Sequence, residues 1–292
     1  MRRLAELGLR QRSVQRCFGV GCVAHALGAP PPASDRWLPA AVLPRLFVAG
    51  NAAPAAVARR HLGDLLDELA NLRLIACDRD RVRAAIVLLP VGEALAVCGP
   101  TPDDSTFHLI GALPRRRVAR WLDVGTGNAI VPLARRGLAT RVVGCDIDAE
   151  AIACARAGAL LSGARELALC RADLLRPVNS GPPWPLITFN APIPAPGGPD
   201  LLTEFWEEAP RLLAGSGEAI VHSVQPLHDY PARLQLPGLT VAVRYTPLGV
   251  EPAFGVTLWR PRGPVRSELV HVRLTAEHPH IARAHFHLDT SH

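Results

Sequence analysis

One stretch of the chain joins a short apolar strand to a tight glycine turn. Residues 121–129 read W-L-D-V-G-T-G-N-A, so a strand ending at Asp123 runs directly into Gly125 and Gly127, and an apolar helical run over residues 130–138 follows. Glycine tolerates positive φ and has no Cβ, which lets the backbone come close to a ligand lying over the end of the strand and the start of the helix. The stretch therefore predicts an α/β fold with a nucleotide-like cofactor at this turn.

A dinucleotide is disfavoured, because Ile130 occupies the position of the third glycine in the NAD and FAD fingerprint. A second strand, residues 141–145, ends at Asp146, and its distance from the glycine turn matches the gap of about 20 residues expected before a ribose-binding carboxylate. An ionised carboxylate there can accept charge-assisted hydrogen bonds from both ribose hydroxyls. Asp148 follows as the expected N-cap of a helix over residues 149–162.

This order of strand, glycine turn, helix, strand and acidic residue resembles the S-adenosylmethionine (SAM) turn of the Rossmann-like, class I SAM-dependent methyltransferases. The resemblance covers residues 107–260 and implies a seven-stranded Rossmann-like sheet with SAM as the cofactor. It includes a third strand, residues 168–172, and Asp173 beyond it faces the adenine amino group in this family. The other expected elements are a helix over residues 201–213 and strands over residues 218–223, 239–245 and 254–259. The implied cofactor residues are Phe107, Asp123, Gly125, Thr126, Gly127, Asp146, Ile147, Asp173, Leu174 and Asn190.

The fourth expected strand, residues 184–189, leads into Asn190, Ala191, Pro192 and Ile193. This sequence resembles the Asn-Pro-Pro-aromatic motif of the release-factor glutamine and ribosomal RNA guanine-N2 methyltransferases. In that family the asparagine oxygen and the following backbone carbonyl accept hydrogen bonds from the target NH2 group, and the aromatic ring stacks on the planar substrate. The resemblance implies catalytic roles for Asn190, Ala191 and Pro192.

The motif is degenerate, because Ala191 replaces the first proline and Ile193 replaces the aromatic residue. Loss of the aromatic platform removes a base-stacking contact worth about 1–3 kcal/mol, which disfavours a flipped base as acceptor. The alternative interpretation is a proline-rich loop that leaves a strand and has no chemical role.

Three further side chains are candidates for contact with substrate. The resemblance implies that His108 reaches the acceptor and that Ile193 lies beside it. It also places Phe107 in the wall of the cofactor pocket. His222 falls near the end of the fifth expected strand, where it is either a base or substrate ligand or a histidine of the rim without a catalytic duty.

The first 105 residues differ in character from the rest. They predict helices over residues 2–27, 40–48 and 55–70, and a β-hairpin of residues 82–89 and 94–98. We therefore expect two domains: a smaller helical, winged-helix-like domain over residues 1–105 that recognises or covers the substrate, and a SAM-binding domain over residues 106–292. The alternative role for the first domain is a packing surface or a dimer interface.

The composition fits a globular protein, with 49% apolar residues in 292. No apolar run reaches the roughly 18 residues needed to cross a bilayer, so no membrane association is expected. Residues 17–29 are faintly similar to a secretory signal, but His25 interrupts them and the expected cofactor is cytosolic, which predicts a cytoplasmic protein.

Charge and cysteine content indicate neither a nucleic-acid surface nor a metal site. The formal net charge is +6, but the arginines fall in short groups such as residues 115–117 and 135–136, which favours solvated faces over a phosphate-binding surface. The seven cysteines form no C-x-x-C pair, and the C-terminal segment holds six of the eleven histidines without an interleaved cysteine. We expect that segment to be an exposed strand or arm and expect no metal.

The expected reaction is direct, in-line transfer of the SAM methyl group to a nucleophile, with nitrogen favoured. The expected acceptor is a small molecule or peptide of specialised metabolism, as in natural product biosynthesis. Three alternatives stay open: an RNA or protein amide N-methyltransferase, an enzyme that cleaves or cyclises SAM, and a SAM-binding module without activity. Nucleic acid is the less favoured acceptor, and the sequence predicts no particular oligomeric state.

Overall fold

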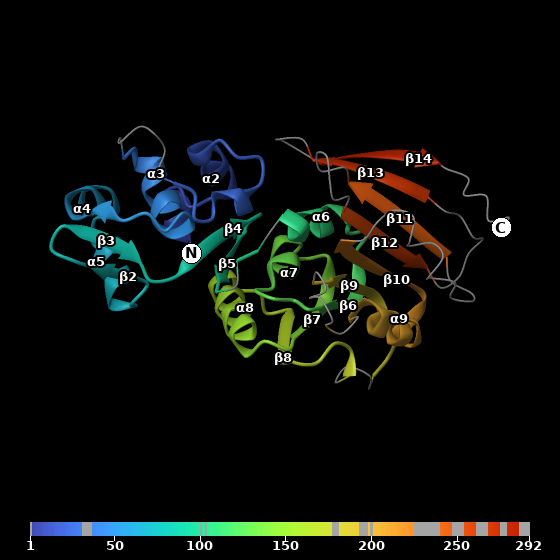
Figure 1. The fold of residues 1–292 in the computed structure, drawn as a ribbon. Helices are drawn as coiled ribbons and strands as arrows, with labels where there is room; N and C mark the ends of the chain where they lie inside the picture. The colour runs from blue at the N-terminus through green and yellow to red at the C-terminus, as the bar shows by residue number, and fades with distance from the viewer. Residues whose placement is uncertain are drawn as a thin grey trace. The chain divides into compact units, whose positions relative to one another are not determined.

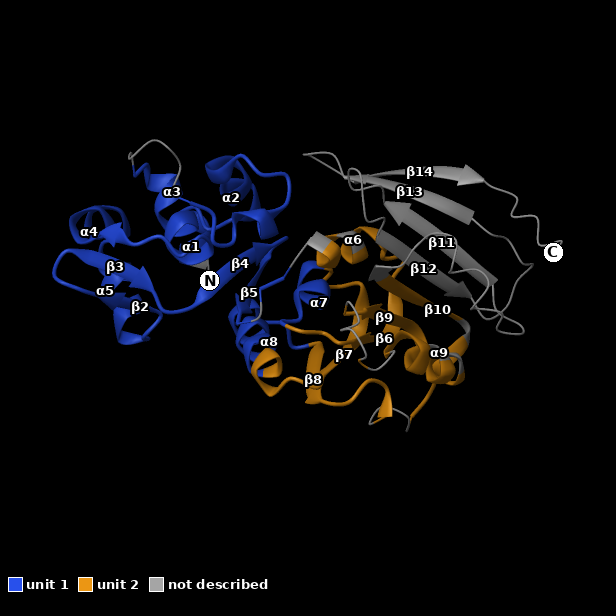
Figure 2. Cartoon of the chain, in the orientation of Figure 1, with its two compact units in different colours: residues 1–104, 128–134, 153–165 blue, residues 105–127, 135–152, 166–292 orange. Residues whose placement is uncertain are grey.

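The computed structural model describes residues 2–30, 37–99, 101–102, 104–176, 181–192, 198, 201–224, 240–246, 254–260, 268–274 and 279–285. The chain forms two compact units, which are described separately (Figure 2). The first unit comprises Met1–Asp104, Asn128–Ala134 and Ala153–Arg165, and the second comprises Ser105–Gly127, Arg135–Ile152 and Glu166–His292.

The second unit is built on one mixed sheet (Figure 1). Its strands are β6 (Val118–Val124), β7 (Ala139–Asp146), β8 (Leu167–Arg171), β9 (Trp184–Asn190), β10 (Leu213–Val224), β11 (Thr240–Thr246), β12 (Phe254–Arg260), β13 (Glu268–Leu274) and β14 (Pro279–His285). The order across the sheet is β14-β13-β11-β12-β10-β9-β6-β7-β8, and the five strands from β10 to β8 are parallel neighbours. The helices that connect these strands or precede them are α6 (Asp104–Ala112), α7 (Ile130–Ala134), α8 (Ala149–Ser162) and α9 (Leu201–Leu212), of which α7 and residues 153–162 of α8 belong to the first unit. An α/β fold with a parallel central sheet agrees with the Rossmann-like prediction.

The central strands are buried, as their nearly continuous apolar sequences predict for a parallel sheet covered on both faces. Trp121, Leu122, Leu186 and Ile187 are fully inaccessible to solvent. On one face, the ring of Phe189 stacks on that of Phe205 from α9 at a centroid distance of 4.9 Å. The apolar interior therefore fixes β6 and β9, the two strands from which the glycine turn and Asn190 emerge.

The sheet has nine strands among the described residues, so the predicted count of seven was wrong. The seven expected strands are those that run across the sheet in the order β11-β12-β10-β9-β6-β7-β8, including the antiparallel pair β11 and β12. The C-terminal segment adds the antiparallel hairpin β13–β14, which joins the free edge of β11 through parallel pairing at Arg244 and Tyr245. A strand edge with unpaired backbone groups is a ready template for another strand, which explains why this segment extends the sheet.

The first unit begins with short helices: α1 (Arg2–Glu6), α2 (Gln11–Phe18), η1 (Val23–Ala26), α3 (Pro39–Leu43), the π-helical η2 (Pro44–Val48), α4 (Ala55–Leu62) and α5 (Asp64–Asn71). Its strands β1 (Ala53–Pro54), β3 (Arg81–Ala84) and β2 (Ile75–Cys77) form a small antiparallel sheet in that order, and β4 (Val87–Val91) pairs with β5 (Ala94–Cys98) in a separate hairpin.

Two predicted elements of this region were wrong in extent. The single helix over residues 55–70 is two helices, because Gly63 takes a φ of +53° between α4 and α5. The predicted strand over residues 82–89 is divided between β3, which pairs with β1 and β2, and β4, which pairs only with β5. In both cases the residue types favour one continuous helix or strand, but the backbone changes direction within it.

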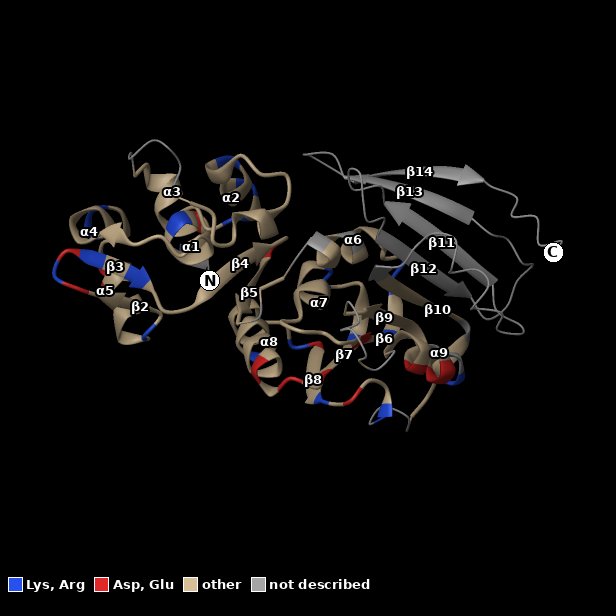
Figure 3. Cartoon of the chain, in the orientation of Figure 1, with Lys and Arg blue, Asp and Glu red and all other residues tan. Residues whose placement is uncertain are grey.

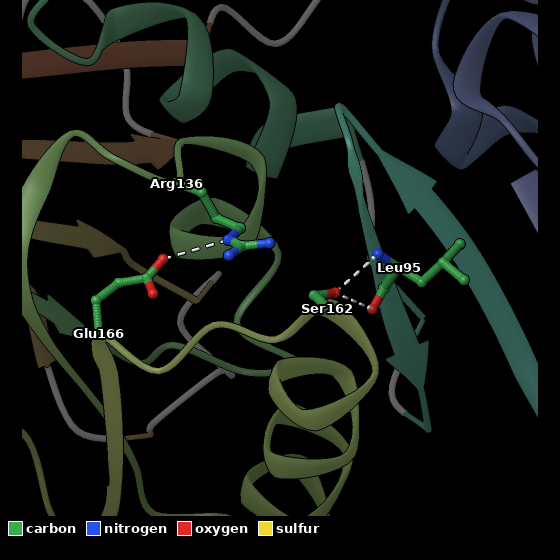
Figure 4. Close-up of polar contacts among 4 residues, drawn as sticks. All are labelled: Leu95, Arg136, Ser162 and Glu166. Atoms are coloured by element: carbon green, nitrogen blue, oxygen red, sulfur yellow. Dashed lines mark hydrogen bonds and ion pairs between the residues drawn. The ribbon is translucent and has the colours of Figure 1, made fainter. Parts of the chain in front are cut away.

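The β4–β5 hairpin is held by the end of α8 (Figure 4). The backbone N–H of Leu95 donates to Ser162 Oγ at 3.0 Å, and the Ser162 hydroxyl donates to the Leu95 carbonyl at 3.2 Å. A Cβ on Gly158, one turn earlier, would lie 3.3 Å from both the Leu95 oxygen and the Val97 nitrogen, so the missing side chain permits this close approach. Ser162 thus supplies backbone hydrogen bonds to β5, and Gly158 lets α8 pack close to this strand.

Figure 4 also shows a polar contact within the second unit, where Arg136 lies 3.2 Å from Glu166. Both side chains are partly exposed, so this ion pair contributes little to stability. None of the helices in the described parts of the chain is both long enough and apolar enough to span a bilayer.

Ser162→Ala should lower the free energy of unfolding by about 1–3 kcal/mol, because it leaves the buried N–H of Leu95 without its partner. Urea denaturation followed by circular dichroism measures the change. Ser13→Ala is the matched control, because Ser13 lies in helix α2 and its loss should change stability by no more than about 0.5 kcal/mol. Equal effects of the two substitutions would show that Ser162 does not anchor the hairpin.

Candidate active site

The residues singled out in the sequence meet at the carboxyl edge of the parallel strands. In the strand register, Val124 pairs with Cys145 on one side and with Phe189 on the other, so the glycine turn, Asp146 and Asn190 follow three adjacent strands at one edge. His222 on β10 pairs with Asn190 and belongs to the same row. Open α/β sheets bind their ligands at this edge.

The glycine turn adopts the conformation that its sequence predicts. Gly125 and Gly127 have φ values of +59° and +52°, a region that disfavours residues with a side chain. A Cβ on Gly125 would lie 3.2 Å from the Phe189 ring and 4.0 Å from the Asn190 carbonyl oxygen. The turn therefore packs directly on the end of β9 and leaves its backbone open to a ligand.

Asp123 lies beneath this turn and is almost completely buried, with 2% of its surface exposed. Thr126 donates a hydrogen bond of 2.6 Å to one carboxylate oxygen, and the Thr188 hydroxyl donates to the other. Burial raises the pKa of Asp123 to about 6, although the two hydroxyls act in the opposite direction. The carboxylate is engaged in holding the turn to β9, so its direct contact with a cofactor stays a prediction.

Two residues that the sequence analysis missed complete this support. Thr188 also accepts a 2.7 Å hydrogen bond from Trp121 Nε1, which makes its hydroxyl a bridge between two strands. A Cβ on Gly144 would lie 2.9 Å from Thr126 Oγ1, so glycine at this place in β7 makes room for the threonine. The available signals were a hydroxyl within the apolar strand 184–189 and a glycine within a β-branched strand.

Asp146 is oriented by the backbone around it. Its two carboxylate oxygens accept hydrogen bonds from the N–H groups of Gly127 at 2.8 Å and Asp148 at 2.9 Å. Each oxygen retains a lone pair for a further donor, which fits a ribose diol. The next side chain, Ile147, is 61% exposed, and its contact with a cofactor stays a prediction. The Asp148 carboxylate accepts from the Glu150 N–H at 2.8 Å, which confirms the predicted N-cap of α8.

The end of β8 gives a less definite arrangement. Asp173 forms a 3.0 Å ion pair with Arg176; the arginine side chain is exposed and that of Asp173 is half-buried. Leu174 has a positive φ of +46°, and its carbonyl accepts a 3.5 Å hydrogen bond from the Cys145 thiol. Burial raises the pKa of that thiol, which makes Cys145 a core residue and not a nucleophile. Contacts of Asp173 and Leu174 with adenine stay predictions.

Asn190 connects three elements through its side chain. Its Nδ2 donates to Ser105 Oγ at 2.9 Å and is 3.5 Å from Thr106 Oγ1, both at the start of α6. Its Oδ1 lies 3.1 Å from Nδ1 of His222, a buried residue on β10, and the N–H of Ala191 donates to the His222 carbonyl at 2.8 Å. The structure therefore brings together Asn190, Ala191 and His222.

The other predicted substrate contacts are only partly described. Phe107 is half-buried on α6 and Pro192 is exposed after β9. The side chain of His108 and all of Ile193 lie outside the described residues. Ser105, the last residue of the predicted N-terminal domain, is a direct partner of Asn190, and a lone serine gave no signal for this role. No group of three or more metal-ligating side chains occurs in the parts of the chain that the structure describes.

Comparison with known proteins gives one family match. Residues 96–236 match the model of the methyltransferase small domain. No curated protein matches the chain.

Several solved structures are similar to parts of this chain. The 16S rRNA N2 G1207 methyltransferase of T. thermophilus, in complex with AdoMet and guanosine, is 18% identical, with a TM-score of 0.47 over 74% of this chain and 67% of that one. The ribosomal protein L11 methylase of Lactobacillus delbrueckii subsp. bulgaricus is 22% identical, with a TM-score of 0.44 over 53% and 77% of the two chains. The precorrin-6y C5,15-methyltransferase of Geobacter metallireducens GS-15 is 16% identical, with a TM-score of 0.45 over 55% and 90%.

Asp146→Ala should weaken SAM binding by about 1.5–3 kcal/mol, because it removes a charge-assisted acceptor for the ribose hydroxyls. Isothermal titration calorimetry measures the affinity. Asp148→Ala is the control, because that side chain caps α8 and should leave SAM affinity unchanged. An unaltered affinity in Asp146→Ala would place the ribose elsewhere.

The stability of the fold should depend on pH through Asp123. Its pKa is raised from 3.8 to about 6, so the folded chain retains a proton that the unfolded chain releases in this range. The free energy of unfolding should therefore fall by on the order of 2 kcal/mol as pH rises from about 4 to about 6, and then level off. Asp123→Asn should lack this decline in urea denaturation at several pH values. Parallel curves for the two proteins would contradict the proposed burial of the carboxyl group.

Proposed function

We propose that this chain, a SAM-dependent methyltransferase whose cofactor is S-adenosyl-L-methionine, transfers the methyl group to a nitrogen of a small-molecule or peptide acceptor. The acceptor is held by Asn190, the Ala191 carbonyl and Pro192, in a cytoplasmic enzyme of specialised metabolism. One observation carries the proposal: the side-chain amide of Asn190 is held at both ends, by Ser105 and by His222, and the residue lies beside the glycine turn, with its backbone carbonyl oxygen 4.0 Å from the position of a Cβ on Gly125.

The hydrogen bonds of Asn190 determine what it can offer to an acceptor. Its amino group is directed at the hydroxyls of Ser105 and Thr106. In this orientation Oδ1 faces His222, so Nδ1 of the imidazole carries the hydrogen and occupies one of the two lone pairs of the oxygen. Among the described residues no other group donates to this oxygen, so one acceptor lone pair is left. A nucleophile oriented by Asn190 must therefore bring a hydrogen, as an amine or amide nitrogen does and a carboxylate oxygen does not.

The described residues fit SAM at the turn. Gly125 and Gly127 leave the backbone uncovered, Asp146 keeps lone pairs for the ribose, and the exposed Ile147 can cover adenine. We assign Phe107, Asp173 and Leu174 to the same pocket from the family resemblance. When bound, SAM supplies a methyl group that its sulfonium has already activated.

The protein then has to position the acceptor. Asn190 Oδ1 and the Ala191 carbonyl would accept two hydrogens of the acceptor nitrogen and so direct its lone pair toward the methyl group. Ser105 and His222 hold Asn190 in the orientation that this requires. Such positioning can lower a barrier by about 7–11 kcal/mol without an acid or base at the site.

For the N-terminal region we propose a substrate-recognition or cap domain over residues 1–105, followed by the SAM-binding domain over residues 106–292. The order η2, β1, α4, α5, β2, β3, with β3 between the other two strands, supports a winged-helix-like fold for its centre.

The charges of this region favour an acceptor other than nucleic acid. The exposed side of α5 is acidic, and its Asp67 pairs with Arg59 at 2.5 Å while Glu68 pairs with Arg3. In the turn from β2 to β3, Asp78 and Asp80 alternate with arginines, so that the charge is mixed (Figure 3). A surface that binds phosphates would concentrate positive charge.

Incubation with methyl-labelled SAM and fractionated cell extract tests the proposed function. We expect label in an acceptor of low mass, and Asn190→Ala should reduce the rate of transfer by about 10-fold to 100-fold, as for a lost hydrogen bond of about 1.5–3 kcal/mol. His222→Asn can place an amide N–H near the position of Nδ1, so it should retain more activity than His222→Leu.

Other results would contradict the proposal in different ways. Label in ribosomal RNA or in a translation factor would support an RNA or protein amide methyltransferase instead. Release of methylthioadenosine would indicate that the enzyme cleaves SAM. Equal loss in His222→Asn and His222→Leu would show that the Nδ1 donor does not orient Asn190.

A further inference from the structure

The first unit contains a guanidinium group that is almost completely buried. Arg45 lies in the π-helical segment η2 and has 3% of its surface exposed. Its Nε and Nη1 atoms are both buried, and neither has a hydrogen-bond partner among the residues that the structure describes. Arginine is rarely buried without a partner, because the desolvated charge is costly unless an anion or several acceptors compensate for it.

The apolar residues around Arg45 account for its burial, but they do not compensate its positive charge. The next three residues of η2, Leu46, Phe47 and Val48, are at most 1% exposed. The π-helical turn is held by the Ala49 N–H, which donates to the Pro44 carbonyl at 3.2 Å. Single π-helical turns occur frequently at functional sites, because the wider turn reorients a side chain.

Trp37 covers one face of the guanidinium, with its ring centre 3.8 Å from the Arg45 Cζ. A cation–π contact of this kind offsets part of the desolvation of the charge. It acts perpendicular to the guanidinium plane, however, whereas the N–H groups lie in that plane. The contact with Trp37 therefore leaves the buried N–H groups of Nε and Nη1 without acceptors.

One described residue with a titratable group that senses the charge of Arg45 is Cys17 on α2. Burial raises the pKa of its thiol, and the positive charge of Arg45 only partly offsets this, so the thiol is neutral at pH 7. No carboxylate of the described residues pairs with Arg45, as every such ion pair in this unit involves another arginine. Among the described residues, the positive charge of Arg45 therefore has no negatively charged partner.

We propose that Arg45 is the cation of a carboxylate-binding site in the N-terminal region, with Trp37 as one wall. A planar carboxylate matches the in-plane N–H groups of a guanidinium. One buried cation balances one negative charge, whereas a dianionic phosphate would leave an excess charge in an apolar setting. This inference is independent of the proposed methyl transfer, and its test does not measure activity.

Thermal unfolding of the full chain in sodium acetate and in sodium chloride at equal ionic strength tests the site. Acetate should raise the melting temperature of the wild type above its value in chloride, by about 2 °C or more at saturating concentration. Arg45→Met removes the charge at similar volume, so it should abolish the difference between the salts and should melt in chloride no lower than the wild type. Arg60→Met replaces an exposed arginine of α4 and should behave as the wild type.

The proposal fails if acetate and chloride act equally on the wild type, or if Arg45→Met keeps the acetate effect. It also fails if Asp35→Asn, a change close to Trp37 in the sequence, creates an acetate effect that the wild type lacks, because an internal carboxylate would then be the natural partner. Should Arg45→Met not fold, NMR line broadening of 13C-acetate by the wild type and its reduction in Arg45→Lys decide the question. Equal broadening by these two proteins would overturn the site.

Discussion

The buried carboxylate of Asp123 is the interaction on which the rest of the site depends. It accepts hydrogen bonds from Thr126 in the glycine turn and from Thr188 in β9, and thereby joins the loop that should bind the cofactor to the strand that carries Asn190. Because the group is out of contact with water, its geometry is set by two hydroxyls in a medium where hydrogen bonds are strong. Burial raises the pKa of this carboxyl group, and the same buried group holds the glycine turn in place in the absence of a ligand.

Asn190 makes a second junction of the same kind, between the start of α6 and the end of β10. Its partners Ser105 and His222 come from positions 85 and 32 residues away in the sequence. The Phe189 ring, one residue earlier, packs against both α9 and the glycine turn. Short-range sequence motifs thus supply the functional groups, and distant residues decide how these groups are oriented.

The parts that could be predicted from the sequence are those specified by a few consecutive residues. The strand before Gly125, the conformation of the turn and the N-cap at Asp148 each follow from local backbone chemistry, and the structure confirms them. The extent of the helix over residues 55–70 could not be predicted, because composition alone did not show that Gly63 would break it. Pairing partners were also beyond reach: the attachment of β13 to β11 and the role of Ser105 depend on contacts between segments far apart in the chain.

The single free lone pair of the Asn190 oxygen has a consequence for how often an acceptor can be modified. Under the proposed function, a nitrogen is aligned only while it still has a hydrogen to share with that oxygen. Each turnover replaces one such hydrogen by a methyl carbon, so the methylated product should be a poorer substrate for a second cycle. The number of hydrogens on the acceptor nitrogen would therefore limit the number of methyl groups added, and a nitrogen without hydrogens would not be methylated further.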